Sequence, residues 1–183
     1  LAKQPQDRFA TWADFANALL AVQHALPAQR TQDSEAQRFA LLRALPFFAD
    51  FHDVALWELM RLGRWRWAPK GKVILFEGQP GDSFYVLVEG RVSITREGWQ
   101  LSTLGPGVTL GEMTYLQPEH KIRSATAVAE TDVLVLKVRN PSLMEASADL
   151  QSRFDKAFIK VLVSRLAATS KQLGAWELSA PQD

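Results

Sequence analysis

Cysteine is absent from this chain of 183 residues. The absence excludes a disulfide framework, a thiolate metal site and a cysteine nucleophile. The three histidines, His24, His52 and His120, are far apart and lack the spacing of metal ligands. No apolar run reaches the roughly 18 residues of a membrane span, so no membrane segment is predicted. A chain without cysteine is compatible with a reducing compartment, and we expect a cytoplasmic location.

An excess of charge of one sign is also missing. The 21 Lys and Arg residues nearly balance 20 Asp and Glu residues, for a net charge of +1. Binding of nucleic acid through bulk charge is therefore disfavoured, and no nucleic-acid partner is predicted. Trp65 and Trp67 alternate with Arg64 and Arg66, which favours an edge strand over a nucleic-acid contact. No nucleophile–base pair or metal cluster is apparent, so neither an enzyme nor a metal site is expected.

Hydrophobic residues make up 47% of the chain, which is enough for a packed core. Residues 65–138 contain short β-branched or aromatic runs separated by glycine-containing turns, a pattern typical of a small sandwich or barrel. Within it, Glu97 and Gly98 stand where a tight hairpin needs positive φ. Helical patterns lie on both sides, so the sequence predicts a mainly β domain with flanking helices.

Capping residues predict where the helices begin and end. Ser34 with Gln37 forms a capping box for one helix, and Asp53 can cap the next. Asn140 can cap a short helix, and Gly174 is a plausible stop for a long helix that starts near residue 149. In the long helix one apolar stripe is expected to pack in the core or against a partner helix; it comprises Phe154, Phe158, Val161, Leu162 and Leu166.

The segment LGEMTYLQPEHKIRSATAV, residues 110–128, places an acid and an arginine at opposite ends of a short excursion. Gly111 lets the backbone approach a ligand closely, and a helix starting between Glu112 and Thr114 offers unpaired N–H groups to a phosphate. Arg123 can grip two phosphate oxygens. A carboxylate only accepts hydrogen bonds, so Glu112 suits a ribose hydroxyl. Together they indicate a compact sugar phosphate closed into a ring.

The runs EGQPGDSFYVLVEGRVSI, LGEM and RSATAV resemble the cyclic-nucleotide-binding domain, and the resemblance extends from Gln37 to Leu173. It implies an eight-stranded jelly-roll β-barrel with N-terminal helices and short and long C-terminal helices. It also implies a regulatory domain whose phosphate-binding cassette contains Glu112 as the ribose acid and Arg123 as the phosphate arginine. The ligand-binding residues expected from this match are Gly111, Glu112, Met113, Thr114, Arg123, Ser124, Ala125 and Thr126. The match also makes Gly78, Gly81, Asp82 and Gly90 turn positions, and Phe84 and Val86 core residues.

The chain departs from the family pattern inside the cassette. Leu110 replaces a common phenylalanine, and Thr114 and Tyr115 replace a small residue and a leucine. The extra length includes Glu119, which we expect to face solvent. Ser124 stands where guanine-preferring members often carry threonine, which favours cyclic AMP over cyclic GMP.

The base is often capped by the last helix in this family. Leu173 and Trp176 are the two candidates for that role here, since an aromatic side chain can stack on a base. The sequence leaves the choice between them open.

The first residues carry a second resemblance. Leu1, Pro5 and Arg8, followed by a helix, resemble the end of a protein kinase's large lobe. The chain itself lacks a glycine-rich loop and the catalytic and magnesium-binding Asp motifs, so it should not phosphorylate anything. We therefore expect residues 1–26 to be a helical segment that ends a kinase domain, 27–33 a linker and 34–183 the nucleotide-binding domain. Alternatively, residues 11–22 form an amphipathic helix that binds a partner.

Three functional hypotheses follow. The first is a regulatory module for cyclic AMP or cyclic GMP that controls an attached Ser/Thr protein kinase. The second is a ligand-free jelly-roll module for docking or dimerisation, and under it a homodimer is one possible assembly. The third is a transcription regulator of the catabolite-activator type, which needs a helix-turn-helix after the long helix. Because the chain ends within ten residues of Leu173, DNA reading is not expected in this fragment.

Overall fold

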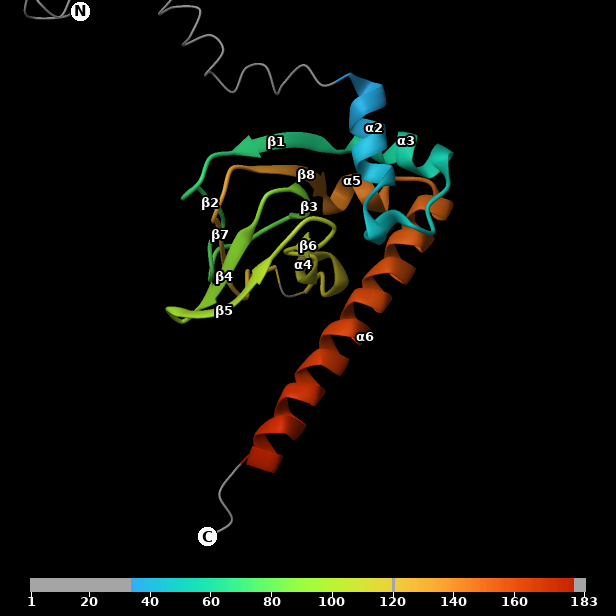
Figure 1. Ribbon diagram of the computed structural model, residues 1–183. Coiled ribbons are helices and arrows are strands. Elements are labelled where there is room, and N and C mark those ends of the chain that lie inside the picture. The colour runs from blue at the N-terminus through green and yellow to red at the C-terminus, as the bar shows by residue number, and fades with distance from the viewer. Residues whose placement is uncertain (1–33, 120, 180–183) are drawn as a thin grey trace, which may run out of the picture. The chain divides into compact units, whose positions relative to one another are not determined.

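The computed structural model describes residues 34–119 and 121–179 (Figure 1). The predicted kinase end at 1–26, the linker at 27–33 and His120 lie outside the described residues. In the described part, helices precede and follow a block of strands, as the sequence predicts. No described helix combines the length and apolar character that crossing a membrane would require.

The strands form two antiparallel four-stranded sheets. The first sheet has the order β1 (Arg64–Ala68), β8 (Val133–Arg139), β3 (Ser83–Glu89) and β6 (Thr109–Leu110). The second has the order β2 (Val73–Leu75), β7 (Thr126–Ala129), β4 (Val92–Arg96) and β5 (Trp99–Leu104). Within the described residues, no ladder joins one sheet to the other. The prediction of a mainly β domain with flanking helices is confirmed, whereas closure into a jelly-roll barrel stays a prediction.

Local strand features follow the sequence closely. The β4–β5 turn contains Glu97 at φ 52° and Gly98 at φ 82°, so the predicted hairpin is confirmed. β1 lies at the edge of the first sheet with Arg64 and Arg66 exposed, which confirms the edge-strand interpretation.

Of the predicted helix starts before the sheets, one is confirmed and one is wrong. The capping box before α2 (Glu35–Arg43) is confirmed, because Ser34 N donates to Gln37 Oε1 at 2.7 Å and Gln37 N donates to Ser34 Oγ at 3.2 Å. The one-turn helix η3 (Pro46–Phe48) follows. α3 (Asp53–Leu62) is capped by His52 and not by Asp53, since His52 Nδ1 accepts from the backbone N–H of Ala55 at 3.1 Å.

The C-terminal helices differ from prediction at both marked residues. α5 (Asn140–Met144) begins at Asn140 with Arg139 at the N-cap, so the predicted capping role of Asn140 is wrong. Its side chain is turned into the protein instead. α6 (Ala148–Ser179) continues through Gly174, so the predicted stop is also wrong. One glycine costs a helix interior only about 1 kcal/mol, which neighbouring helix formers can outweigh.

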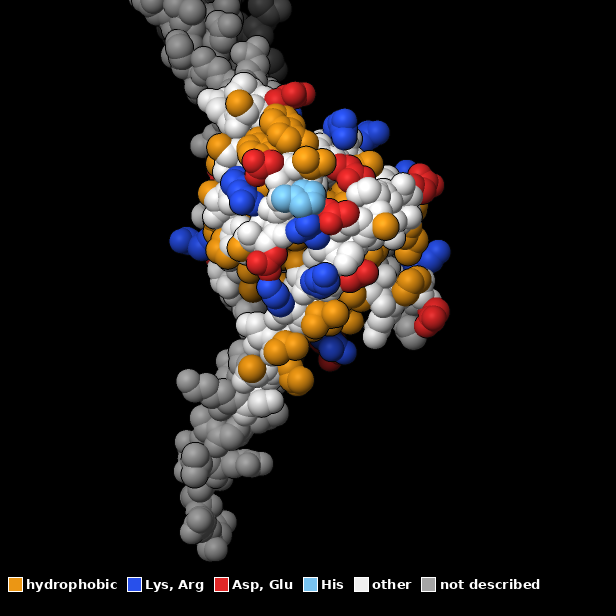
Figure 2. Space-filling model, turned by 90° about the vertical axis from the view of Figure 1, so that its right-hand side faces the viewer, with side chains coloured by type: hydrophobic (Ala, Val, Ile, Leu, Met, Phe, Trp, Pro, Cys, Tyr) orange, Lys and Arg blue, Asp and Glu red, His pale blue; other side chains and the backbone are white. Residues whose placement is uncertain are grey.

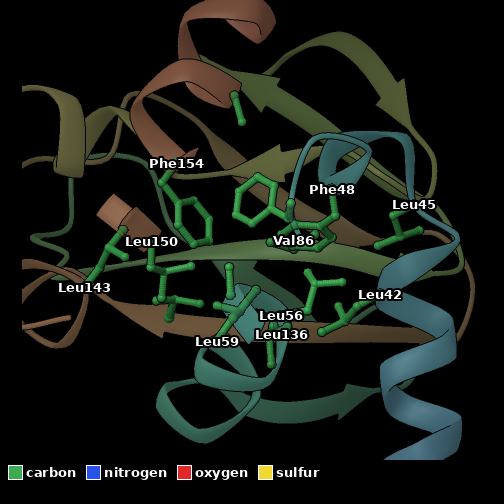
Figure 3. Close-up of a cluster of buried hydrophobic side chains, with 14 of the residues drawn as sticks. Leu42, Leu45, Phe48, Leu56, Leu59, Val86, Leu136, Leu143, Leu150 and Phe154 are labelled. Carbon is green, nitrogen blue, oxygen red and sulfur yellow. The ribbon is translucent and has the colours of Figure 1, made fainter. Parts of the chain in front are cut away.

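The main core lies between the first sheet and the helices (Figure 3). Phe84 and Val86 of β3 are fully buried, as predicted, and Phe154 and Phe158 of α6 pack on the same cluster. A second cluster, including Leu87, Ala127 and Val135, contains side chains from both sheets. Since α6 packs through Phe154 and Phe158 while Leu166 is exposed, the predicted apolar stripe is core only at its beginning.

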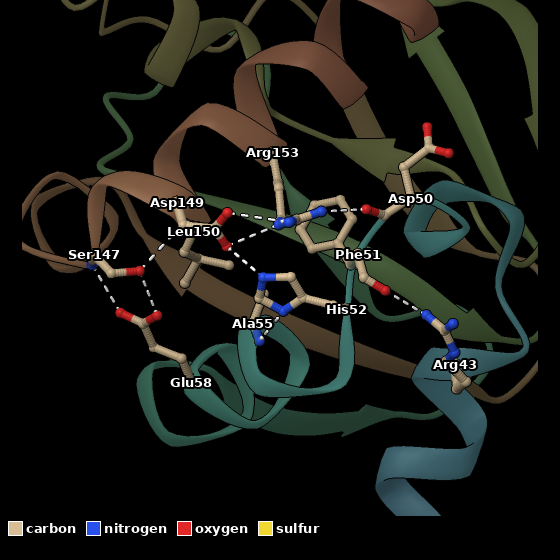
Figure 4. A network of polar contacts seen from close by, with 10 residues as sticks. All are labelled: Arg43, Asp50, Phe51, His52, Ala55, Glu58, Ser147, Asp149, Leu150 and Arg153. Atoms are coloured by element: carbon tan, nitrogen blue, oxygen red, sulfur yellow. Dashed lines mark hydrogen bonds and ion pairs between the residues drawn. The ribbon is translucent and has the colours of Figure 1, made fainter.

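A polar network fastens the start of α6 to α3 (Figure 4). His52 Nε2 lies 3.0 Å from Asp149 Oδ2, and Arg153 Nε donates to the same oxygen at 2.8 Å. Ser147 N donates to Glu58 Oε1 at 2.8 Å. The hydrogen bond from Arg153 holds the pKa of Asp149 below its usual value. The first turns of α6 are therefore anchored by charge as well as by aromatic packing.

Candidate functional site

The site is built on the excursion between β6 and β7. Gly111, at φ 74°, turns the chain directly after β6 into α4 (Met113–Leu116). This helix is a single turn with Glu112 at its N-cap, so the predicted short helix is confirmed. A helix this short has a small dipole, and side chains must supply most of the charge at this site.

Arg123 is the central side chain. It is 6% exposed, and its guanidinium donates to backbone oxygens from two directions. Nη1 donates to Gly111 O at 2.9 Å and Nη2 to Ser83 O at 2.6 Å, while Thr114 Oγ1 lies 3.4 Å from Nη1. The arginine is therefore held against both the start of the cassette and the start of β3.

Burial lowers the pKa of Arg123, whereas the nearby Tyr85, Asp82 and Glu112 raise it. An arginine begins so far above neutrality that it stays charged. The site therefore places a permanent positive charge in a nearly water-free position, where an anion would interact strongly with it.

Two glycines make room for the guanidinium. A Cβ added at Gly81 would lie 2.2 Å from Arg123 Nε and Nη2, and one added at Gly111 would lie 2.2 Å from Nη1. Gly81 has no positive φ, so it is required by close approach and not by backbone conformation. The sequence marked both glycines, but it could not show that both face the same arginine.

Glu112 is almost completely buried, at 2% exposure. Its Oε1 forms an ion pair with Nη1 of Arg165 on α6, and Arg165 Nη2 donates to Thr109 O at 3.1 Å. Sequence reasoning missed Arg165. The available signal was a basic residue directly before Leu166 in the apolar stripe of α6.

Tyr115 makes a second contact between the cassette and α6. Its hydroxyl donates to Asp155 Oδ1 at 3.0 Å, and its ring lies 5.6 Å from that of Phe158. Burial and the carboxylate of Asp155 raise the pKa of Tyr115 to about 12. The departure from the family pattern at this position therefore adds a polar tie to the last helix.

The remaining predicted site residues differ in exposure. Met113 and Ala125 are half-buried and Ser124 is exposed, while Thr126 Oγ1 accepts from Glu77 N at 3.0 Å. Glu119 is exposed, as predicted. Leu173 and Trp176 belong to α6, but their side chains lie outside the described part of the chain.

A cavity of about 970 Å³ lies elsewhere, between η3, the β5–β6 turn and α6. Arg165 lines it, but Gly111, Glu112 and Arg123 do not. We place the candidate site at Arg123, because among the described residues only that region combines a buried cation with a buried acid.

A comparison with known families identifies the domain that contains this region. Residues 65–149 match the cyclic nucleotide-binding domain. The matched range of this cyclic nucleotide-binding domain includes Gly81, Gly111, Glu112 and Arg123. It also covers β1 from Trp65 onward, the other seven described strands and the single-turn helix of the cassette.

Individual proteins are similar to part of this chain. The chain is 33% identical over 127 residues to a cyclic nucleotide-gated potassium channel of Mesorhizobium japonicum, covering 68% of this chain and 35% of the channel. It is 30% identical over 110 residues to a CRP-like cAMP-activated global transcriptional regulator of Mycobacterium tuberculosis, covering 57% and 48%. The matches thus span about a third to a half of these relatives. The catabolite activator protein of Thermus thermophilus superposes with a TM-score of 0.60 at 26% identity, covering 72% of this chain and 63% of that protein.

Proposed function

We propose that this chain binds a cyclic nucleotide, with Arg123 on the cyclic phosphate and Glu112 on the ribose 2′-hydroxyl. The supporting observation is the buried guanidinium between Gly81 and Gly111. Nη1 and Nη2 have protein acceptors, but Nε has none within the described part of the chain. Arg123 therefore keeps donor capacity for phosphate oxygens while the protein fixes its position.

Cyclic AMP is the proposed ligand, in preference to cyclic GMP. Ser124 supports this choice, as does the name of the cAMP-activated Mycobacterium tuberculosis regulator. We further propose a regulatory, non-catalytic role within a larger protein. An attached Ser/Thr kinase is the specific form of that proposal, and it rests on Leu1, Pro5 and Arg8 alone.

Calorimetric titration with cyclic AMP, 2′-deoxy cyclic AMP and cyclic GMP tests the assignment of Glu112. A hydrogen bond to a charged group is worth roughly 1.5–3 kcal/mol, so removing the 2′-hydroxyl should weaken binding about tenfold to a hundredfold. Glu112→Gln should bind cyclic AMP more weakly and should discriminate far less against the deoxy ligand. Absence of heat with all three ligands at millimolar concentration would reject cyclic-nucleotide binding.

Gly81→Ala should weaken cyclic AMP binding at least about tenfold, because the new Cβ would displace the Arg123 guanidinium. Gly105→Ala is a matched control, since a Cβ there meets nothing within 4 Å and Gly105 has no positive φ. Both affinities are measured by titration. Equal affinities of the two variants would contradict the steric role of Gly81.

Ligand-free docking or dimerisation is the second candidate function. Hydrophobic side chains lie along the part of α6 that projects from the domain body (Figure 2). Ile159, Val163 and Leu166 are 58%, 61% and 69% exposed. Sedimentation with and without cyclic AMP distinguishes the two candidate functions. Ligand-free dimerisation predicts self-association that does not change when the nucleotide is added.

A further inference from the structure

The hydroxyl of Thr114 is the meeting point of three hydrogen bonds. It donates to Gly111 O at 3.0 Å, and it accepts from Asn140 Nδ2 at 3.2 Å and from Arg123 Nη1 at 3.4 Å. A hydroxyl has one proton and two acceptor sites. All three are in use, so the direction of each bond is fixed by the others.

Asn140 reaches this hydroxyl from outside the cassette. It is the first residue of α5, and its backbone N–H donates to Asp82 O at 2.7 Å. The residue is 7% exposed, and within the described residues its Oδ1 has no hydrogen-bond partner. A buried unpaired acceptor opposes folding, and the side chain does not cap the helix. The unpaired oxygen therefore offsets part of the stability that the Nδ2 hydrogen bond to Thr114 contributes, and a purely stabilising role explains the amide poorly.

We propose that Asn140 is a positioning residue for Arg123 and acts through Thr114. By filling one acceptor site of the hydroxyl, the amide directs the proton of Thr114 to Gly111 O and its other acceptor site to Nη1. The guanidinium then has one defined orientation beside Gly111. The 3.4 Å contact is long for a hydrogen bond, so it can orient Arg123 without holding it back from a ligand.

The same contacts make the phosphate site sensitive to α5. Asn140 belongs to the C-terminal helices, whereas Thr114 and Arg123 belong to the cassette. A shift of the start of α5 would withdraw the amide, release the hydroxyl and loosen Arg123. This inference rests on the proposed function, in which Arg123 holds the phosphate.

A double-mutant cycle on cyclic AMP affinity tests this relay, in which Asn140 acts on Arg123 through the hydroxyl of Thr114. Asn140→Leu and Thr114→Val should each weaken binding roughly threefold to tenfold, the range of one hydrogen bond. The double variant should bind no more weakly than the weaker single variant. The midpoint of thermal unfolding of Asn140→Leu should change little, since leucine removes the unpaired acceptor together with the hydrogen bond to Thr114. An unchanged affinity for Asn140→Leu, or the same loss in the Thr114→Val background, would overturn the proposal.

Arginine side-chain NMR without nucleotide keeps the two proposals separate. The Nε–H resonance of Arg123 is identified by its loss in Arg123→Lys, and it should shift in Asn140→Leu while that of exposed Arg91 does not. If the resonance shifts but the native chain binds no cyclic nucleotide, the proposed function fails and the relay stands. An unmoved Arg123 resonance overturns the relay whatever the affinities are.

Discussion

Arg123→Ala is expected to lower the affinity for cyclic AMP by at least about a hundredfold. In the proposed binding mode the substitution removes two charge-assisted bonds to phosphate oxygens, each worth roughly 1.5–3 kcal/mol. Arg123→Lys should recover little, because an ammonium group cannot form the same bidentate contact. Isothermal titration calorimetry measures both variants against the native chain.

Folding must be checked in the same experiment. Arg123 also satisfies the oxygens of Gly111 and Ser83, so its removal should lower stability. Thermal unfolding identifies a temperature at which every variant is folded, and titrations are made there. Arg91→Ala serves as a control, since its side chain is 64% exposed. If Arg123→Ala binds cyclic AMP within threefold of the native chain, the phosphate role of Arg123 is wrong.

Phe154→Ala should lower the free energy of unfolding by about 3–5 kcal/mol. Phe154 is fully buried at the point where α6 meets the first sheet. Its ring lies 5.3 Å from that of Phe51 and 5.4 Å from that of Phe84, in edge-to-face contacts. Removing it leaves a cavity among aromatic rings that cannot close without breaking other contacts.

Ile159→Ala is the matched control for this loss. It lies on the same helix but is 58% exposed, so its cost should be within about 0.5–1 kcal/mol. Urea unfolding measures both variants. A Phe154→Ala loss as small as that of Ile159→Ala would show that α6 contributes little to the core.

The part of the site that sequence reasoning could predict is local. Gly111, Glu112 and Arg123 lie within one excursion, and their residue types fit the proposed ligand chemistry without reference to the rest of the fold. The turn at Glu97 and Gly98 was predictable for the same reason, because positive φ is a property of one or two residues.

The part that could not be predicted depends on how distant elements pack. Arg165 meets Glu112 across 53 residues, and Asn140 meets Thr114 across 26. Both contacts require α6 and α5 to lie in specific places. The spacing of apolar residues along a helix predicts the helix but not where it packs. Asn140 has a side chain typical of a helix cap, but it is the first residue of α5 and Arg139 occupies the N-cap position. Its amide bonds to Thr114 instead, because Asn140 directly follows the end of β8 and its side chain is buried there.

Because α6 is long, a small tilt of the helix moves its far end by a large distance. Among the side chains of α6 that the structure describes, those buried in the core end at Phe158, and Arg165 makes a further contact with Glu112. Residues 166–179 extend beyond Arg165 for about 20 Å at 1.5 Å per residue. A tilt of about 10° at Arg165 would move the far end of the helix by roughly 4 Å. A change too small to disturb the aromatic packing is therefore amplified along the helix into a displacement large enough to make or break a contact at its tip.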